Sequence, residues 1–168
     1  MRIKPLVIAL SLVVALSGCN SSSTTSTSNS SSSGTSANGV HVSGALGSAP
    51  VITFDSMTTP PTSLVIKDIA VGTGAQALAT STVTTHYTGY GLNTKQKFDS
   101  SWDRGQPISF GLNQVIQGWS QGIPGMKVGG RRLLIIPGDL AYGANPPAGG
   151  TIQPNEPLVF VVDLTAVQ

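Results

Sequence analysis

From Ser63 to the C-terminus, the chain is a series of short β-rich runs separated by clusters of Gly, Pro and Asn. Such runs predict strands, and the turn-forming clusters between them favour antiparallel neighbours. The expected strands are residues 64–71, 82–90, 131–136 and 158–164. One short helix is expected at residues 116–121, because an apolar stripe there ends at a glycine and a proline. The sequence therefore predicts an α+β domain with an antiparallel sheet around one short helix.

The last predicted strand has the two-residue period of a β-strand. One face carries Leu158, Phe160, Val162 and Leu164, and the other carries Val159, Val161 and Asp163. We therefore expect Phe160 to point into the core.

The first 18 residues have the features of a secretory signal peptide. Arg2 and Lys4 precede an apolar run from Leu6 to Leu16, which is too short to span a membrane. The run leads into Leu-Ser-Gly-Cys19, which resembles the lipobox of bacterial lipoproteins. This resemblance implies that cleavage of the signal peptide leaves Cys19 as the first residue of the mature protein, with lipid on its thiol. An ordinary signal peptide with an unmodified thiol is the alternative.

Residues 19–38 are expected to form a disordered tether. Between residues 20 and 38, 14 of the 19 residues are Ser or Thr and none is charged, so there is too little apolar surface to offset the entropy of ordering. Residues 39–61 are interrupted by three prolines, and we expect an irregular arm with at most a short strand at Val51–Phe54. The folded domain is expected to cover residues 62–168.

Charge and cysteine content exclude several kinds of site. The nine basic and seven acidic residues become seven of each without the leader, which leaves no electrostatic case for nucleic acid. Cys19 is the only cysteine, so no internal disulfide or cysteine-based metal cluster can form. The only two histidines, His41 and His86, argue against zinc. We expect neither a metal nor a cofactor.

Four local patterns resemble functional motifs, but the sequence gives little support for the sites that they would form. Residues 118–122 match the G-x-S-x-G of hydrolases, but no histidine follows Ser120. Residues 72–77 match G-x-G-x-x-A, but the next strand begins too soon for a crossover helix. Arg131 and Arg132 are interpreted as a solvated strand edge rather than a phosphate clamp. Glu156 is the only glutamate, which gives little support for a two-carboxylate glycosidase site.

Six segments of the domain combine apolar side chains with a few polar groups. In chain order they are HYTG (86–89), KFDSS (97–101), VIQGW (115–119), GMKVG (125–129), LAYG (140–143) and PLVF (157–160). Together they resemble the FKBP-type peptidyl-prolyl cis-trans isomerases, over roughly residues 62–167. The resemblance implies an antiparallel sheet curled around a short helix, with an apolar cleft that takes a proline ring.

The same resemblance assigns residues to this cleft. Its walls and floor are expected from Tyr87, Phe98, Val115, Ile116, Phe160 and, as the floor, Trp119. Asp99 is expected at the rim, held by Tyr87 and Arg104. The Tyr142 hydroxyl and the backbone N–H of Ile152 are expected to bind substrate carbonyls. His86, which alternates with Tyr87 along its strand, is expected to be structural.

The sequence departs from the best-known family pattern at three places. Ile108 replaces an aromatic wall residue, Gln114 stands where a glutamate is common, and the loop at residues 144–150 is unusual. These departures affect substrate preference and macrolide affinity rather than the reaction.

The expected function is isomerisation of X-Pro bonds in envelope or secreted proteins during their folding. Its substrates are proline-containing polypeptides, a macrolide is a possible inhibitor, and the protein is expected to be a monomer. Lipid on Cys19 is expected to hold it on the outer membrane, or on the outer face of the cytoplasmic membrane in a cell with one membrane. A lipid-anchored, chaperone-like binding module with little turnover is the main alternative. A surface adhesive protein is a third, supported only by the Ser/Thr-rich stalk.

Overall fold

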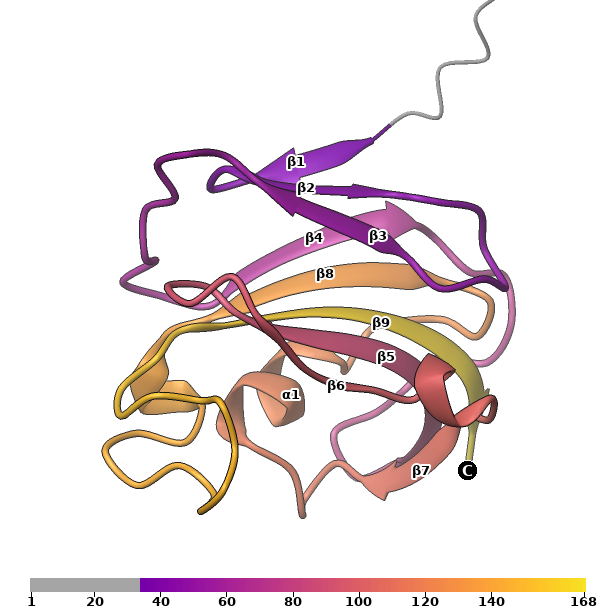
Figure 1. The fold of residues 1–168 in the computed structure, drawn as a ribbon. Coiled ribbons are helices and arrows are strands. Elements are labelled where there is room, and N and C mark those ends of the chain that lie inside the picture. The colour runs from indigo at the N-terminus through magenta and orange to yellow at the C-terminus, as the bar shows by residue number, and fades with distance from the viewer. Residues whose placement is uncertain (1–33) are drawn as a thin grey trace, which may run out of the picture. The chain divides into compact units, whose positions relative to one another are not determined.

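Two antiparallel sheets form the framework of residues 34–168, the part of the chain that this computed structural model describes (Figure 1). The larger sheet contains β4 (Val65–Ala70), β5 (Thr82–Gly91), β6 (Lys97–Ser100), β7 (Ile108–Gly111), β8 (Arg131–Ile136) and β9 (Leu158–Val167). Its order is β4–β8–β9–β5–β6, and β7 pairs with the first part of β5. β6 pairs with the last part of β5. The two short strands therefore share one edge of β5.

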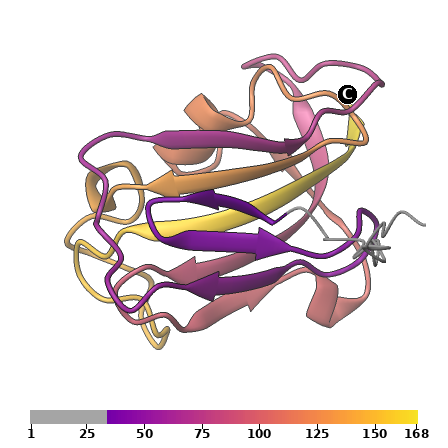
Figure 2. The same cartoon turned by 90° about the horizontal axis from the view of Figure 1, so that it is seen from above.

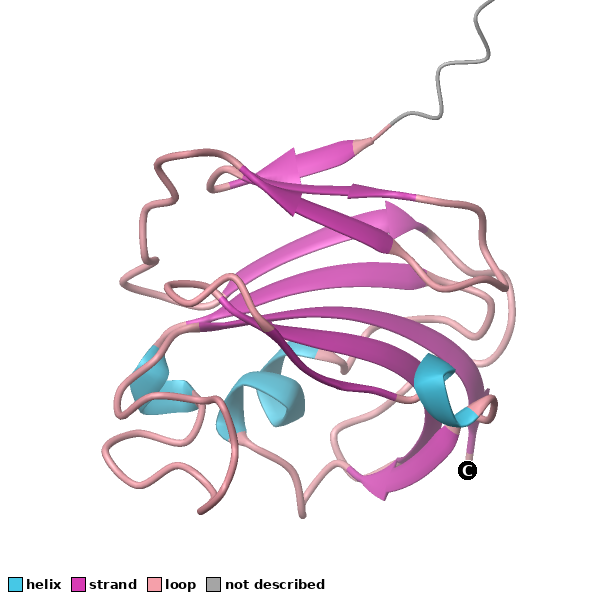
Figure 3. Cartoon of the chain, viewed as in Figure 1, coloured by secondary structure: helices cyan, strands magenta, loops and turns pink. Residues whose placement is uncertain are grey.

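The helix α1 (Gln117–Gly122) lies in the concavity of the larger sheet (Figure 3). Two glycines one turn apart allow its close approach to β8. A Cβ on Gly118 would lie 2.3 Å from the Ile136 side chain, and one on Gly122 would lie 2.7 Å from that of Leu134. The glycines of the G-x-S-x-G pattern thus serve helix packing. Two 3₁₀ turns, η1 (Trp102–Arg104) and η2 (Gly138–Leu140), complete the elements of this part.

Strand β9 is buried on both of its faces. The inward-facing residues belong to the core shared with α1 and include Phe160, as predicted: they are Leu158, Phe160, Val162 and Leu164. The outward-facing Val159 and Val161 belong to a second core on the opposite side of the sheet. The predicted alternation is therefore confirmed, but it separates two cores rather than a core from solvent.

The second core is closed by a smaller, three-stranded antiparallel sheet. It consists of β1 (Thr35–Ala37), β2 (Val40–Ser43) and β3 (Val51–Phe54). Seen from above, these strands lie over the larger sheet (Figure 2). Val40, Val42 and Ile52 are at most 8% exposed, and they pack with Leu133, Ile135, Val159 and Val161 of the larger sheet.

The prediction of an irregular arm at residues 39–61 is therefore wrong, because this segment contains the two paired strands β2 and β3. The short strand expected at Val51–Phe54 is present as β3. The expected tether at residues 19–38 is wrong for its last part, where β1 lies. Asn38 and Gly39 both have positive φ, 50° and 75°, and they form the two-residue turn that joins β1 to β2. This hairpin places Val40 and Val42 on one face, where the larger sheet buries them.

Buried arginines connect segments that are distant in the sequence. Arg131 is 1% exposed and makes two hydrogen bonds to the Asp163 carboxylate, of 2.5 and 2.6 Å. It also donates to the carbonyls of Gly44 and Ser48 in the β2–β3 loop, at 3.2 and 2.6 Å. Arg132 pairs with Asp68 at 2.6 Å and donates to the Gly122 carbonyl at 2.8 Å. The solvated edge expected for this pair is wrong, because both side chains are buried and every guanidinium nitrogen donates a hydrogen bond.

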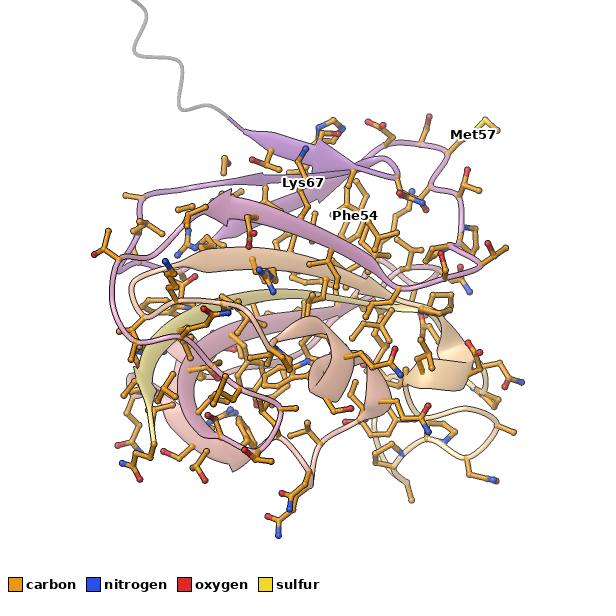
Figure 4. All side chains as sticks on the ribbon, turned by 180° about the vertical axis from the view of Figure 1, so that it is seen from behind. Phe54, Met57 and Lys67 are labelled. Carbon is orange, nitrogen blue, oxygen red and sulfur yellow. The ribbon has the colours of Figure 1, made fainter. Side chains whose placement is uncertain are left out.

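The chain between the two sheets runs along the surface. Phe54 packs against Tyr90 of β5 with ring centroids 5.6 Å apart, and Lys95 donates to the Asp55 carbonyl at 2.7 Å. Beyond these contacts Met57 projects outward with 86% of its surface exposed, whereas Lys67 marks the edge strand β4 (Figure 4). The smaller sheet is thus attached by its apolar face and by polar contacts at its edges.

Most of the predicted elements are present. The helix and the four strands are found with shifts of at most three residues at an end, and residues 131–136 match β8. β6 and β7 were not predicted. The signal peptide, Cys19 and most of the expected tether lie outside the described residues. Between residues 34 and 168, no helix is long and apolar enough to cross a membrane.

Candidate active site

A hollow of about 250 Å³ lies within the concave side of the larger sheet. We call it the aromatic cleft, and its lining residues are Tyr87, Phe98, Asp99, Phe110, Gln114, Val115, Ile116, Trp119, Tyr142 and Phe160. They come from β5, β6, β7, β9, α1, the segment before α1 and the segment after η2. The strand alternation turns every second side chain inward, so the curved sheet supplies walls and the helix supplies a floor.

Trp119 makes this floor rigid. It is 4% exposed and meets three rings nearly at right angles, those of Tyr87, Phe110 and Phe160, with centroids 5.4, 5.5 and 5.3 Å away. Phe98 meets Phe160 edge to face at 5.5 Å. Such edge-to-face pairs each contribute about 0.5–1.5 kcal/mol beyond their buried area. The cleft is therefore held open by ring packing rather than filled by collapsed side chains.

Three polar side chains form the rim. The Tyr87 hydroxyl donates to Asp99 Oδ2, Arg104 donates to Asp99 Oδ1 at 2.5 Å, and Arg104 also donates to the Tyr87 oxygen at 3.0 Å. Arg104 comes from η1, which begins two residues after β6 ends. The arrangement expected around Asp99 is therefore present in the structure.

Their pKa values follow from these contacts. Burial, and next the hydrogen bond to Asp99, raise the pKa of Tyr87 to about 12. Burial alone would raise the pKa of Asp99, but the hydrogen bonds from Arg104 and Tyr87 outweigh it and hold that pKa below its ordinary value. At neutral pH the rim therefore carries a carboxylate, a guanidinium and a protonated phenol.

Tyr142 lies at the open side of the cleft, just after η2, with 37% of its surface exposed. Burial, and then the charge of Asp99, raise the pKa of its hydroxyl. The hydroxyl therefore remains protonated at neutral pH and can donate a hydrogen bond to a bound chain.

Eight of the nine residues that the resemblance assigns to the site line this one cleft, and Ile152 does not. Ile152 lies in the loop after Tyr142 and packs, partly buried, against the core that also contains cleft residues. Gln114 also lines the cleft, whereas Ile108, expected as a replaced wall residue, is absent from the lining. Phe110 takes a place in the wall that the sequence reasoning missed. The sequence indicated a strand with Phe110 on its inner face only through the alternation of Ile108 and Phe110 after a proline.

His86 lies outside the cleft, on the opposite side of β5 from Tyr87. Its Nδ1 is 3.0 Å from the Ser101 hydroxyl oxygen, and its ring stacks on Trp102 with centroids 3.8 Å apart. Both partners belong to the segment that leads to Arg104. This agrees with a structural role for His86.

Other chemistry finds no support in the described part of the chain. The Ser120 hydroxyl donates to the Gln117 carbonyl at 3.0 Å, within its own helix. No group of three His, Cys, Asp or Glu side chains within residues 34–168 could hold a metal ion. What the cleft offers is an apolar, preformed site with a polar rim.

Comparisons with known proteins agree with this geometry. A family model described as FKBP-type peptidyl-prolyl cis-trans isomerase matches residues 74–165. An FK506-binding protein of Streptomyces anulatus is 56% identical over 110 residues, which cover 64% of this chain and 89% of that protein. A probable FK506-binding protein of Corynebacterium glutamicum is 53% identical over 104 residues, covering 62% and 86%.

Solved structures have the same fold over the same share of the chain. FkpA of Escherichia coli matches with 41% identity and a TM-score of 0.58, covering 62% of this chain and 48% of that one. AtFKBP13 matches with 36% identity and a TM-score of 0.56, covering 65% and 96%. All residues of the aromatic cleft lie within the range of the family model, whereas the three-stranded sheet precedes it.

Proposed function

Since the chain belongs to the FKBP-type peptidyl-prolyl cis-trans isomerases, we propose that the aromatic cleft is its active site and binds the proline ring of a polypeptide substrate. The chain is a peptidyl-prolyl isomerase. The observation that supports this site is the convergence of aromatic walls, a tryptophan floor and the Tyr87–Asp99–Arg104 rim in one hollow. No bond is made or broken, so no nucleophile is needed.

The cleft can accelerate the rotation by removing water from the amide. The barrier of ~18–20 kcal/mol arises because twisting the peptide bond breaks amide resonance. The planar amide has more charge separation than the twisted one, so an apolar cleft disfavours the ground state more than the transition state. Acceleration by a factor of a thousand to a million requires only ~4–8 kcal/mol. Apolar walls with a few placed hydrogen bonds are of the right size for this effect.

Hydrogen bonds at the rim would orient the substrate. The Tyr142 hydroxyl and the Ile152 N–H would each bind a substrate carbonyl on one side of the proline while the bond turns. Asp99 would act by fixing Tyr87, which donates one hydrogen bond to its carboxylate, and Arg104, which donates two. A macrolide such as FK506, after which the relatives are named, would compete with the substrate for the same apolar walls.

The place of action proposed for this enzyme is the cell envelope. The apolar leader and the Leu-Ser-Gly-Cys19 motif support export and a lipid anchor on Cys19. The described chain begins at β1, in the sheet on the side of β9 opposite the cleft (Figure 1). An anchor attached through this end would leave the cleft open to envelope and secreted proteins.

Two matched substitutions test the assignment of the cleft. Asp99→Val removes the acceptor that holds the rim. Asp103→Val removes an exposed carboxylate four residues later, which within residues 34–168 pairs with Lys97 alone, at 2.7 Å. In a protease-coupled assay with a cis-Pro peptide, we expect kcat/KM to fall at least tenfold for Asp99→Val. The Asp103→Val variant should stay within twofold of wild type. Equal activity of the two folded variants would exclude this cleft as the active site.

A further inference from the structure

Glu156, the only glutamate of the chain, is 3% exposed. Its carboxylate accepts two backbone hydrogen bonds, from the Thr94 N–H at 2.9 Å and from the Gln153 N–H at 2.8 Å. None of the ion pairs within residues 34–168 involves it. A buried carboxylate is unfavourable unless its oxygens are bonded, so the two N–H groups and the charge hold one another in place.

The two N–H groups come from two different segments of the chain. Gln153 directly follows Ile152, in the loop that joins Tyr142 to β9. Thr94 lies in the turn between β5 and β6, the strands that carry much of the cleft wall. One carboxylate therefore ties the loop after Tyr142 to the turn between β5 and β6.

The outer part of that loop is held by few contacts, whereas Ile152 packs partly buried against the core. Residues 147–151 are all exposed. The base of the loop is closed by the Asn155 N–H, which donates to the Gly143 carbonyl at 2.7 Å. Next to Ile152, the Gln153 N–H donates to the Glu156 carboxylate at 2.8 Å, and the Glu156 N–H donates to the Gln153 carbonyl at 3.1 Å. Glu156 therefore fixes the peptide group that follows Ile152 and contributes to the position of the Ile152 N–H.

The neighbouring strand leaves room for this carboxylate. A Cβ on Gly91 of β5 would lie 2.3 Å from Glu156 Oε1 and 2.3 Å from the Thr94 hydroxyl oxygen. The φ of Gly91 is not in the left-handed region, so backbone conformation does not require glycine there. The space for the glutamate does.

On the premise that the aromatic cleft is the active site, we propose that Glu156 is a positioning residue for substrate binding. It does not touch the substrate. It latches the loop so that the Ile152 N–H faces the chain bound at the Tyr142 side. Without the latch, only a fraction of the molecules holds the loop in this arrangement, and the apparent affinity falls by that fraction. The substrate restores the arrangement when it binds, so kcat is preserved.

Two substitutions on different segments break the latch. Glu156→Gln turns one acceptor oxygen into an amide group that faces an N–H, and Gly91→Ala keeps the glutamate but pushes its carboxylate aside. For each, we expect KM for a cis-Pro peptide to rise about tenfold or more, the factor expected for one lost hydrogen bond to a charged group, with kcat within twofold. Amide hydrogen exchange should become faster at Gln153 and Thr94.

Thr94→Ala is the control. It removes the other atom that a Cβ on Gly91 would meet but keeps the backbone N–H that binds Glu156, so KM should not change. Folded Glu156→Gln and Gly91→Ala variants with the KM of wild type would overturn the latch. So would a loss of kcat at constant KM. If Glu156→Gln does not fold, Gly91→Ala alone decides. Absence of isomerase activity in the wild type would instead refute the premise.

Discussion

Replacing Ile52 with alanine should destabilise the whole described unit, although Ile52 lies in a short strand outside the range of the family model. Its side chain is 8% exposed and packs into the second core with Val159 and Val161 of β9. Ile→Ala in a core costs ~2–5 kcal/mol. Because a small three-stranded sheet can relax into the space, we expect about 2–3 kcal/mol. For a unit of this size, that lowers Tm by roughly 6–12 °C.

Urea unfolding followed by tryptophan fluorescence measures this effect. Trp102 and Trp119 are the only tryptophans, and neither belongs to the cluster around Ile52. A shift of their transition therefore shows that the two sheets unfold together. Val51→Ala is the matched control, since Val51 is the adjacent residue of β3 and is 57% exposed, and it should change stability by less than about 0.5 kcal/mol. Equal midpoints for both variants would falsify the packing of the two sheets as one unit.

Other predictions concern the cleft and the anchor. Tyr142→Phe should lower kcat/KM about two- to tenfold, as loss of one hydrogen bond implies, with an unchanged urea midpoint; wild-type kcat/KM would remove Tyr142 from the site. The pKa of Asp99 is held below its ordinary value, so its contribution to stability is present above about pH 4 and is lost as the pH falls through its lower folded-state pKa. Asp99→Asn should therefore flatten the acid side of the stability profile measured by unfolding between pH 2 and 6, and an unchanged profile would contradict this. Cys19→Ala should move the protein from the membrane fraction to a soluble or precursor pool, and unchanged detergent partitioning would refute the lipid anchor.

The sequence predicts the larger sheet well because its strands carry their own signals. Residues 133–136 are continuously apolar after two arginines, and residues 158–164 alternate. The smaller sheet was missed because its prolines and its Ser/Thr-rich surroundings outweighed two weaker signals. These were the Asn38–Gly39 pair, which favours a hairpin, and the alternation of Val40 and Val42. Short strands are stabilised by what they cover, and the sequence does not show that partner.

The partners of the buried polar groups could not be predicted either, because they are distant in the sequence. Arg131 pairs with Asp163, 32 residues away, and Arg132 with Asp68, 64 residues away. From sequence alone, two arginines beside two glycines resemble a solvated edge, because local composition carries no information on such partners. Most of the cleft could be assigned in advance because its residues lie in recognisable motifs. Phe110 lies outside those motifs and was missed.

The two faces of the larger sheet belong to two different cores. Along β9, Phe160 and Val162 face the core that contains the cleft, whereas Val159 and Val161 face the smaller sheet. A change on the outer face reaches the cleft only through the backbone of β9, which is paired along its length with β5 on one side and along its first half with β8 on the other. Ile52→Ala should therefore lower stability while kcat/KM stays at the wild-type value. This separation would allow the N-terminal part to serve attachment without altering the chemistry of the cleft.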